Sequence, residues 1–496
     1  MKHTTLLATL GTSFCVLAAL SCSGGGGGGT GVPSASTTPV TSTGTVTDFG
    51  SVYVNDRKYE INDSTTTTKD DSTVSGDQNA KSVLRRGMVV TVSGTSSGTT
   101  RTASTIIHQN TLEGPIQIKN PIDASNGTLT VLGQTVVVDN TTQFDDTSTP
   151  NKLDSLSLND VIEVSGFVKE DTTGVFIMAS FIEKKLGATV CSSICEVKGK
   201  ITSHTPLQSS FQISTLIVNY TTADITDMPN PNSVNWVGLL VEVKGSNYNA
   251  GTLTATKVER EGFQAPNGDQ VELEGYVTSL IGGAGSGQFM IGTTTVQATN
   301  ALYLGGTIAE VAVGQKLEVE GSISNNIITA TKVKFQDSVR LEGIVSSITG
   351  STMTLGGMPT ITITSNSATE VQSNTPVAVG DRVKVRGREG ATANGTVNVI
   401  ATEVDGNGPD NCNPCDVDLQ GAVQVVSNPN LTILGVQINT STSGSDFSDP
   451  ADFKGTSDQA IGRAAFFGAV TIGTVVEVKG RLTNGAITWR EVELEE

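Results

Sequence analysis

The chain has 496 residues, of which 55 are glycine, and aromatic residues make up only 4%. Its formal net charge of −18 repels phosphate backbones, which argues against nucleic-acid binding. Abundant glycine, threonine and serine, without a long amphipathic helical pattern, indicate an all-β, turn-rich protein and exclude a helical bundle.

The N-terminus has the parts of a secretion signal. Met1–Thr5 is short and basic, Leu6–Leu20 is apolar, and a small residue directly precedes Cys22. This resembles a bacterial lipoprotein signal, although Ala19 stands where leucine is usual. The resemblance implies a signal peptide at residues 1–21, cleavage before Cys22 and a lipid on that cysteine. The alternative is an uncleaved transmembrane helix, for which the apolar segment is short.

Residues 22–43 are rich in glycine, serine, threonine and proline. This composition predicts a flexible tether with a reach of roughly 25 Å. Ser23 follows the cysteine, so the aspartate that usually retains such lipoproteins at the inner membrane is absent. We therefore expect an outer-membrane lipoprotein that faces the periplasm or the cell surface, with the membrane as a partner through the lipid.

An eight-residue pattern occurs six times along the rest of the chain. Each copy has a turn residue, an alternating strand with period two and a closing glycine. The copies are Gly87–Gly94, Asn159–Gly166, Gly238–Gly245, Gly314–Gly321, Gly380–Gly387 and Gly473–Gly480. Such self-similarity predicts one small β module that is used as a building block.

The other strands of a module can be found around this pattern. An opening strand contains a glycine, as in Leu273–Val277, and a hairpin such as Gly127–Val138 follows it. A last strand such as Thr329–Val333 closes the unit. A flat sheet of about five strands leaves two open edges, so we predict that each module curls into a small, antiparallel, OB-like β-barrel. A flat sandwich is the alternative.

Six modules are predicted, here numbered 1 to 6. They span residues 44–110, 111–187, 191–262, 270–336, 338–406 and 412–496. Because modules of this size are individually marginal and most connections are short, neighbours in the sequence are expected to pack in a row. Glu259–Asp269 is a predicted hinge, and Ser441–Ala469 is a long insertion in module 6.

The lipoprotein cysteine, the polyglycine tether and these modules together resemble the domain of unknown function 5666 (DUF5666) family. The opening Leu-Glu-Gly and the closing Ala-Thr-Lys-Val strand carry the resemblance further, over residues 41–496 in six copies. It implies a bacterial envelope protein built of small β domains. It implies no catalytic residue.

The four cysteines beyond the signal form two close pairs. Cys191 with Cys195 and Cys412 with Cys415 each stand directly before an opening strand. In an oxidising compartment we expect a disulfide within each pair. The alternatives are a redox-active pair, which needs a helix N-terminus after it, and a zinc site that joins all four thiolates.

Few residues suit catalysis. His108 and His204 lie in different modules and are expected on the surface, and no known catalytic motif is present. The sequence therefore predicts no catalytic residue, and the protein is not expected to be an enzyme.

The acidic turns Asp139–Asp146 and Asp405–Asn411 offer oxygen ligands for calcium, but their spacing is irregular. Ordinary Asx turns explain them better. No metal site and no cofactor are predicted.

Two functions from different classes fit these features. The first is a non-enzymatic, lipid-anchored array of modules that contacts other envelope proteins or surface polymers. The alternative is a small-ligand or saccharide-binding site in one specialised barrel. The aromatic residues for such a site are few, namely Trp236, Trp489, Tyr53 and Tyr276, and they do not repeat between modules.

Overall fold

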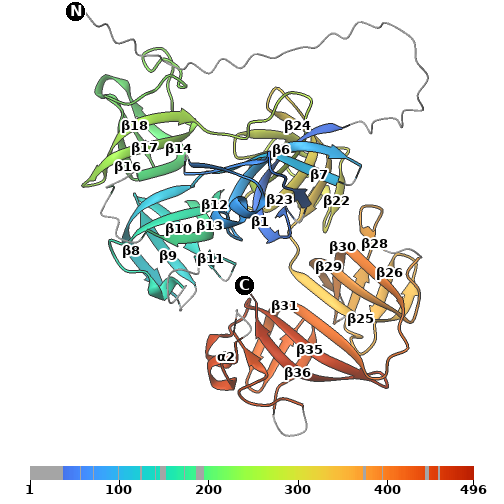
Figure 1. Cartoon of the computed structure of the whole chain (residues 1–496). Helices are drawn as coiled ribbons and strands as arrows, with labels where there is room; N and C mark the ends of the chain where they lie inside the picture. The colour runs from blue at the N-terminus through green and yellow to red at the C-terminus, as the bar shows by residue number, and fades with distance from the viewer. Residues whose placement is uncertain are drawn as a thin grey trace, which may run out of the picture. The chain divides into compact units, whose positions relative to one another are not determined.

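The computed structural model describes residues 37–495 apart from short gaps (Figure 1). The residues left out of this range are 56, 71, 99, 123–125, 140, 146–151, 173, 186–190, 192–194, 373–375, 394, 442–445 and 456–458. The predicted signal peptide, Cys22 and most of the predicted tether lie outside the described residues. Strands dominate the described part, which has two short α-helices, α1 (Asp77–Val83) and α2 (Arg463–Ala469). No described helix is long and apolar enough to cross a membrane.

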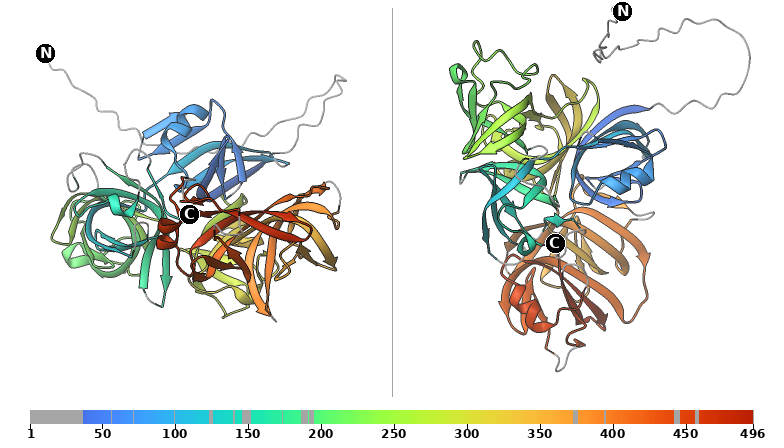
Figure 2. Two further views of the ribbon diagram at one scale, coloured as in Figure 1. Left: turned by 90° about the horizontal axis from the view of Figure 1, so that it is seen from below. Right: turned by 60° about the vertical axis from the view of Figure 1, so that its left-hand side comes forward.

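Module 1 shows the plan of the modules, and Figure 2 shows its blue strands curving into a barrel. Its barrel strands are β1 (Thr38–Phe49), β2 (Val52–Val54), β3 (Arg57–Glu60), β6 (Val89–Ser97) and β7 (Thr100–His108). They pair in the closed order β1-β2-β3-β7-β6-β1. This confirms the OB-like barrel, with one correction. The pair β3 and β7 is parallel, so the sheet is not wholly antiparallel.

Modules 2 to 5 close their barrels in the same order. The strands of module 2 are β8 (Leu112–Pro121), β9 (Gly127–Val131), β10 (Gln134–Val138), β12 (Val161–Asp171) and β13 (Gly174–Lys184). Those of module 3 are β14 (Cys195–Thr205), β15 (Ser210–Ile213), β16 (Leu216–Asn219), β17 (Leu240–Asn249) and β18 (Thr252–Arg260). Those of module 4 are β19 (Gln270–Leu280), β20 (Gln288–Ile291), β21 (Thr294–Gln297), β23 (Lys316–Ser324) and β24 (Ile327–Phe335). Those of module 5 are β25 (Val339–Thr349), β26 (Thr352–Leu355), β27 (Ile361–Thr364), β29 (Asp381–Ala393) and β30 (Thr396–Pro409).

Module 6 has the same succession of strands but an open barrel. Its strands are β31 (Cys415–Ser427), β32 (Asn430–Ile433), β33 (Val436–Asn439), β35 (Val475–Thr483) and β36 (Ala486–Leu494). In the described part of the chain, β33 pairs with β32 alone and not with β36. The insertion contributes α2, and the rings of Phe453 and Phe466 are buried in the core.

Short additional elements line the connections between barrel strands. Five strands run parallel to the last barrel strand of their module: β4 (Thr66–Lys69), β11 (Gln143–Phe144), β22 (Leu302–Leu304), β28 (Glu370–Gln372) and β34 (Phe453–Lys454). A further strand, β5 (Ser72–Ser75), pairs with β4. The 3-10 helices are η1 (Leu153–Ser155), η2 (Pro206–Gln208) and η3 (Ile308–Glu310).

Two backbone demands explain the eight-residue repeat. Its first residue has a positive φ in every copy, from 68° at Asn159 to 95° at Gly380, which asparagine and glycine adopt most readily. Its closing glycine lies at a β-bulge, where a Cβ on Gly245 would come within 2.5 Å of the carbonyl oxygen of Thr254. Between them, alternate residues such as Leu317 and Val319 are buried, so the predicted period of two is confirmed.

Modules join through their opening strands, and here two expectations are corrected. β1 pairs with β19, β8 with β14, and β25 with β31, so module 1 pairs with module 4 and the strand pairings do not follow a simple row. β1 begins at Thr38, so Thr38–Thr43 belong to a strand and not to the tether. Thr38–Thr43 pair with β6 of their own barrel. The other edge of the first half of an opening strand is left unpaired by its own barrel, and a second module covers it.

Candidate functional site: the seams between modules

Several buried acidic groups lie where the opening strands of two modules pair, and these places are called seams. Seam 1–4 pairs Val40–Thr43 with Gln270–Leu273 in parallel. Seam 2–3 pairs Leu112 and Glu113 with Glu196 and Val197, and seam 5–6 pairs Arg340–Glu342 with Asp418–Gln420, both antiparallel. At each seam, acidic residues on the outward face of one barrel lie against the second module.

Glu272 is the buried acid of seam 1–4, with 3% of its surface exposed. Arg101 Nη2 lies 2.6 Å from its Oε1, and Ser42 donates a hydrogen bond of 2.9 Å to its Oε2. Arg101 also donates to the hydroxyl of Tyr59 at 2.9 Å. Burial, followed by the charge of Glu272, raises the pKa of Tyr59 to about 12. The carboxylate of Glu272 is therefore compensated by a cation that module 1 supplies.

Arg57 links three modules beside this seam. Its Nη2 lies 2.8 Å from Glu320 of module 4 and 3.2 Å from Glu370 of module 5, and its Nε lies 3.8 Å from Glu272. Burial lowers the pKa of Arg57, but the carboxylates outweigh burial and raise it above its usual range. Lys332 adds an ion pair of 2.7 Å with Glu370. This network fixes module 5 to the pair formed by modules 1 and 4.

Seam 2–3 contains two buried acids instead of an acid and an arginine. Glu196 is 7% exposed and Glu242 is 3% exposed. Burial, and then the hydrogen bond with Glu242, raises the pKa of Glu196 to about 9. Among the described residues, the Oε1 atom of each has no hydrogen-bond partner, and Lys198 Nζ lies 3.9 Å from Glu242 but 3.3 Å from Glu261. Two adjacent carboxyls in such a site hold one proton between them.

His108 joins modules 1 and 2 and corrects a prediction, because it is 1% exposed and not on the surface. Its Nδ1 lies 2.9 Å from the carbonyl oxygen of Val89, and its Nε2 lies 3.2 Å from Oε1 of the buried Glu163. The ring nitrogens of His108 thus contact one group of its own module and one of module 2. Burial raises the pKa of Glu163, but His108 and then Lys185 outweigh it and lower this pKa to about 2.

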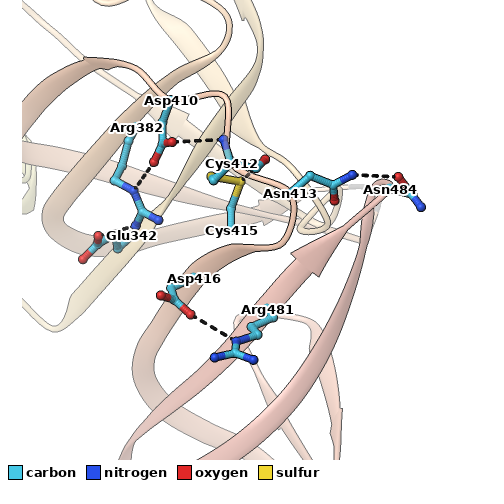
Figure 3. The surroundings of a disulfide bond; sticks show 9 residues. All are labelled: Glu342, Arg382, Asp410, Cys412, Asn413, Cys415, Asp416, Arg481 and Asn484. Carbon is cyan, nitrogen blue, oxygen red and sulfur yellow. Dashed lines mark hydrogen bonds and ion pairs between the residues drawn. A yellow bond between two sulfur atoms is a disulfide. The ribbon is translucent and has the colours of Figure 1, made fainter.

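Figure 3 shows the connection that leads into seam 5–6. Cys412 and Cys415 are joined by a disulfide with a Cα–Cα distance of 5.0 Å. Asp410 accepts a hydrogen bond of 3.1 Å from the backbone N–H of Cys412, and Arg382 Nε donates to the same carboxylate at 3.0 Å. The loop that leaves β30 is thereby held to module 5 immediately before β31 begins.

The second disulfide joins Cys191 to Cys195, also with a Cα–Cα distance of 5.0 Å. Both pairs therefore match the expected connectivity, and no thiolate of either pair is left for zinc. A strand, β14 or β31, follows each pair, so the helix N-terminus that favours a reactive thiolate is absent from both. Cys22, the predicted lipidation site, lies outside the described residues.

The tryptophans are buried in cores, and the second histidine packs, half-buried, against one of them. His204 stacks on Trp236 with 4.6 Å between ring centroids, and its Nε2 lies 3.0 Å from the hydroxyl of Tyr220. Trp236 is fully buried and Trp489 is 7% exposed, so neither is a platform for a sugar. The structure does not bring His108 and His204 into one site.

The acidic turns behave as Asx turns where their contacts are described. Asp139 Oδ1 accepts from the backbone N–H of Thr141 at 2.9 Å. Two triplets of carboxylates do come together elsewhere, Glu272 with Glu318 and Glu320, and Glu477 with Glu493 and Glu495. Basic side chains are paired with both triplets, Arg57 and Arg101 with the first and Lys479 with the second.

Sequence reasoning missed the seam acids, although one signal was available. Glu196, Glu272 and Asp418 stand at the same place in modules 3, 4 and 6, three residues before the opening glycine. Burial, followed by the charges of Glu477 and Glu342, raises the pKa of Asp418 to about 6. A charge that recurs at one strand position indicates an environment that the modules share. From the alternation of a single strand, however, the same residue is predicted to face solvent.

Comparison with known families agrees with this architecture. A family model described as "Domain of unknown function (DUF5666)" matches residues 113–182, 198–259, 274–334, 342–405 and 420–493, more than half of the chain. These matches are modules 2 to 6. Module 1 is one of the six copies that the sequence predicts, but the family model does not match it. Its barrel strands nevertheless pair in the same closed order as those of modules 2 to 5. No curated protein matched the chain.

Proposed function

The chain belongs to the DUF5666 family, and we propose that it is a non-enzymatic, lipid-anchored envelope protein. In this proposal the joined modules present their loops and barrel faces to other envelope proteins or to surface polymers. The lipid on Cys22 holds the array at the outer membrane, on its periplasmic or its external side.

One observation supports a scaffold most strongly: several charged side chains that are buried or half-buried serve contacts between modules. Arg57, Glu163 and Glu272 each contact a residue of another module, and their partners are neutralising groups. A catalytic site needs convergent polar groups that face a substrate. Here the convergent groups face one another across seams, as an assembly of repeated domains requires.

Replacement of Cys22 tests the anchor. Cys22→Ser is expected to move the protein from the membrane fraction to the soluble fraction, because a protein without its lipid has no anchor. Cys15→Ser, in the apolar part of the same signal, is the matched control and should leave it in the membrane. Membrane retention of Cys22→Ser would contradict the proposal.

Protease treatment of intact and lysed cells then separates the two sides of the membrane. Cleavage in the connections of intact cells, for example within Glu259–Asp269, supports display on the surface. Protection until lysis supports a periplasmic array with envelope partners.

A further inference from the structure

A cleft of about 430 Å³ lies beside seam 2–3. Its walls come from β10, β12 and β13 of module 2 and from β14, the turn after β15 and the turn before β17 of module 3. The two opening strands pair over two residue positions, Glu113 with Glu196 and Leu112 with Val197. The cleft has the size of a small-molecule site.

One side of this cleft is apolar and partly open to solvent. Val175 is 44% exposed and Val237 is 48% exposed, and both line the cleft. Phe176 lies between Val175 and the buried Ile177 on β13 and is half-buried. A Cβ on Gly174 would come within 3.2 Å of the Phe176 ring, so a glycine gives that ring room beside the backbone. In the part of the chain that the structure describes, no other aromatic ring stacks on Phe176.

The rim of the cleft is polar, and each charge on it has a partner. Lys200 Nζ lies 3.3 Å from Glu170 Oε2, and the side chains of both are well exposed. Lys198 is paired with Glu261 at 3.3 Å. Hydroxyls of Thr135, Thr202 and Ser214 complete the lining. The buried Gln134 links the two modules at the cleft, because its amide donates a hydrogen bond of 2.9 Å to the carbonyl oxygen of Ile213 in module 3.

These features select one class of ligand. An ion would need an unpaired opposite charge, and the charges here are already paired. A wholly apolar ligand would cover Lys200, Glu170 and the hydroxyls without hydrogen bonds in return. A sugar ring has an apolar C–H face for the wall and hydroxyl edges that both donate and accept. We propose that the cleft between modules 2 and 3 binds a neutral saccharide, with Phe176 under the ring and the Lys200–Glu170 pair at its hydroxyls.

This site does not depend on the scaffold function, and its test does not depend on the anchor. Isothermal titration calorimetry of the full chain with maltotriose, cellotriose and chitotriose is expected to give binding for at least one of the three. Phe176→Ala should weaken that binding about tenfold or more, because the apolar face loses its platform, whereas Phe176→Trp should retain it. Tyr53→Ala, a half-buried aromatic of module 1 outside the cleft, is the matched control and should bind normally.

A second variant distinguishes loss of the binding site from misfolding of Phe176→Ala. Val237→Asp changes an exposed turn residue and places a desolvated charge against the sugar face, so it should also weaken binding while the thermal transition stays in place. Failure of all three trisaccharides to bind overturns the proposal. Unchanged binding in both cleft variants, or preferential binding of a trimer of uronic acids, overturns it as well.

Discussion

Glu196 and Glu272 stand at equivalent positions in modules 3 and 4, yet the structure neutralises them differently. Glu272 forms an ion pair with Arg101 and accepts a hydrogen bond from Ser42 across seam 1–4. Glu196 meets a second acid of its own module, Glu242, and burial together with this contact raises the pKa of Glu196 to about 9. The difference shows that the repeat supplies an acid at this position, and that its neighbours differ: an arginine from the module across seam 1–4 for Glu272, and a second acid of the same module for Glu196.

The largest effect is expected from Glu272→Gln. The substitution leaves Arg101 buried without its carboxylate, which is expected to destabilise seam 1–4 by about 3 kcal/mol. Hydrogen exchange of the amides in β1 and β19 measures the loss locally. Glu60→Gln, which removes an exposed acid paired with Lys58, is the control and should change little. Equal losses in the two variants would contradict the assignment.

A smaller effect is expected from loss of the disulfide that precedes β14. Cys191→Ser combined with Cys195→Ser should destabilise module 3 and seam 2–3 by about 2 kcal/mol, because the closed loop is short. Seam 1–4 should keep its exchange rates. The matched pair, Cys412→Ser with Cys415→Ser, should affect β31 and spare β14, so uniform destabilisation of every module would contradict local disulfides.

An effect of opposite sign, and one that depends on pH, is expected from Glu196→Gln. The folded pKa of Glu196 is raised to about 9 from its ordinary 4.5, so near pH 4 both folded and unfolded chains hold the proton and the variant is neutral. As the pH rises, the unfolded chain releases this proton first, and the wild-type protein loses stability relative to the variant until about pH 9. At pH 8 the variant should therefore be more stable than the wild-type protein.

Urea unfolding between pH 4 and pH 9, followed at β14 by hydrogen exchange, checks this difference. A variant that is less stable than the wild-type protein at pH 8 would show that Glu196 is ionised in the fold. The same pH series on Glu272→Gln should show no gain in stability over the wild-type protein at any pH. The two variants together therefore test whether Glu196 and Glu272 are neutralised differently.

Much of the fold follows from local patterns. The turn at Asn159 or Gly380, the bulge at Gly245 and the alternation of Leu317 with Val319 are each contacts within one module, and short-range geometry specifies them. The pairing of Cys191 with Cys195 is local in the same sense. The candidate sites are different, because the burial of His108 and the cleft beside Phe176 need residues from two modules.

By itself the sequence determined the kind of module, its tandem repetition, the positions of the turns and the two cysteine pairs, because neighbouring residues in the chain make these features. The tertiary structure alone decided that module 1 pairs with module 4, and that Glu272 of module 4 is met by Arg101 of module 1. The physical reason is that the opening strands carry similar unpaired edges. Backbone pairing does not distinguish one such edge from another, so the choice depends on side chains that come together only when the whole chain has folded.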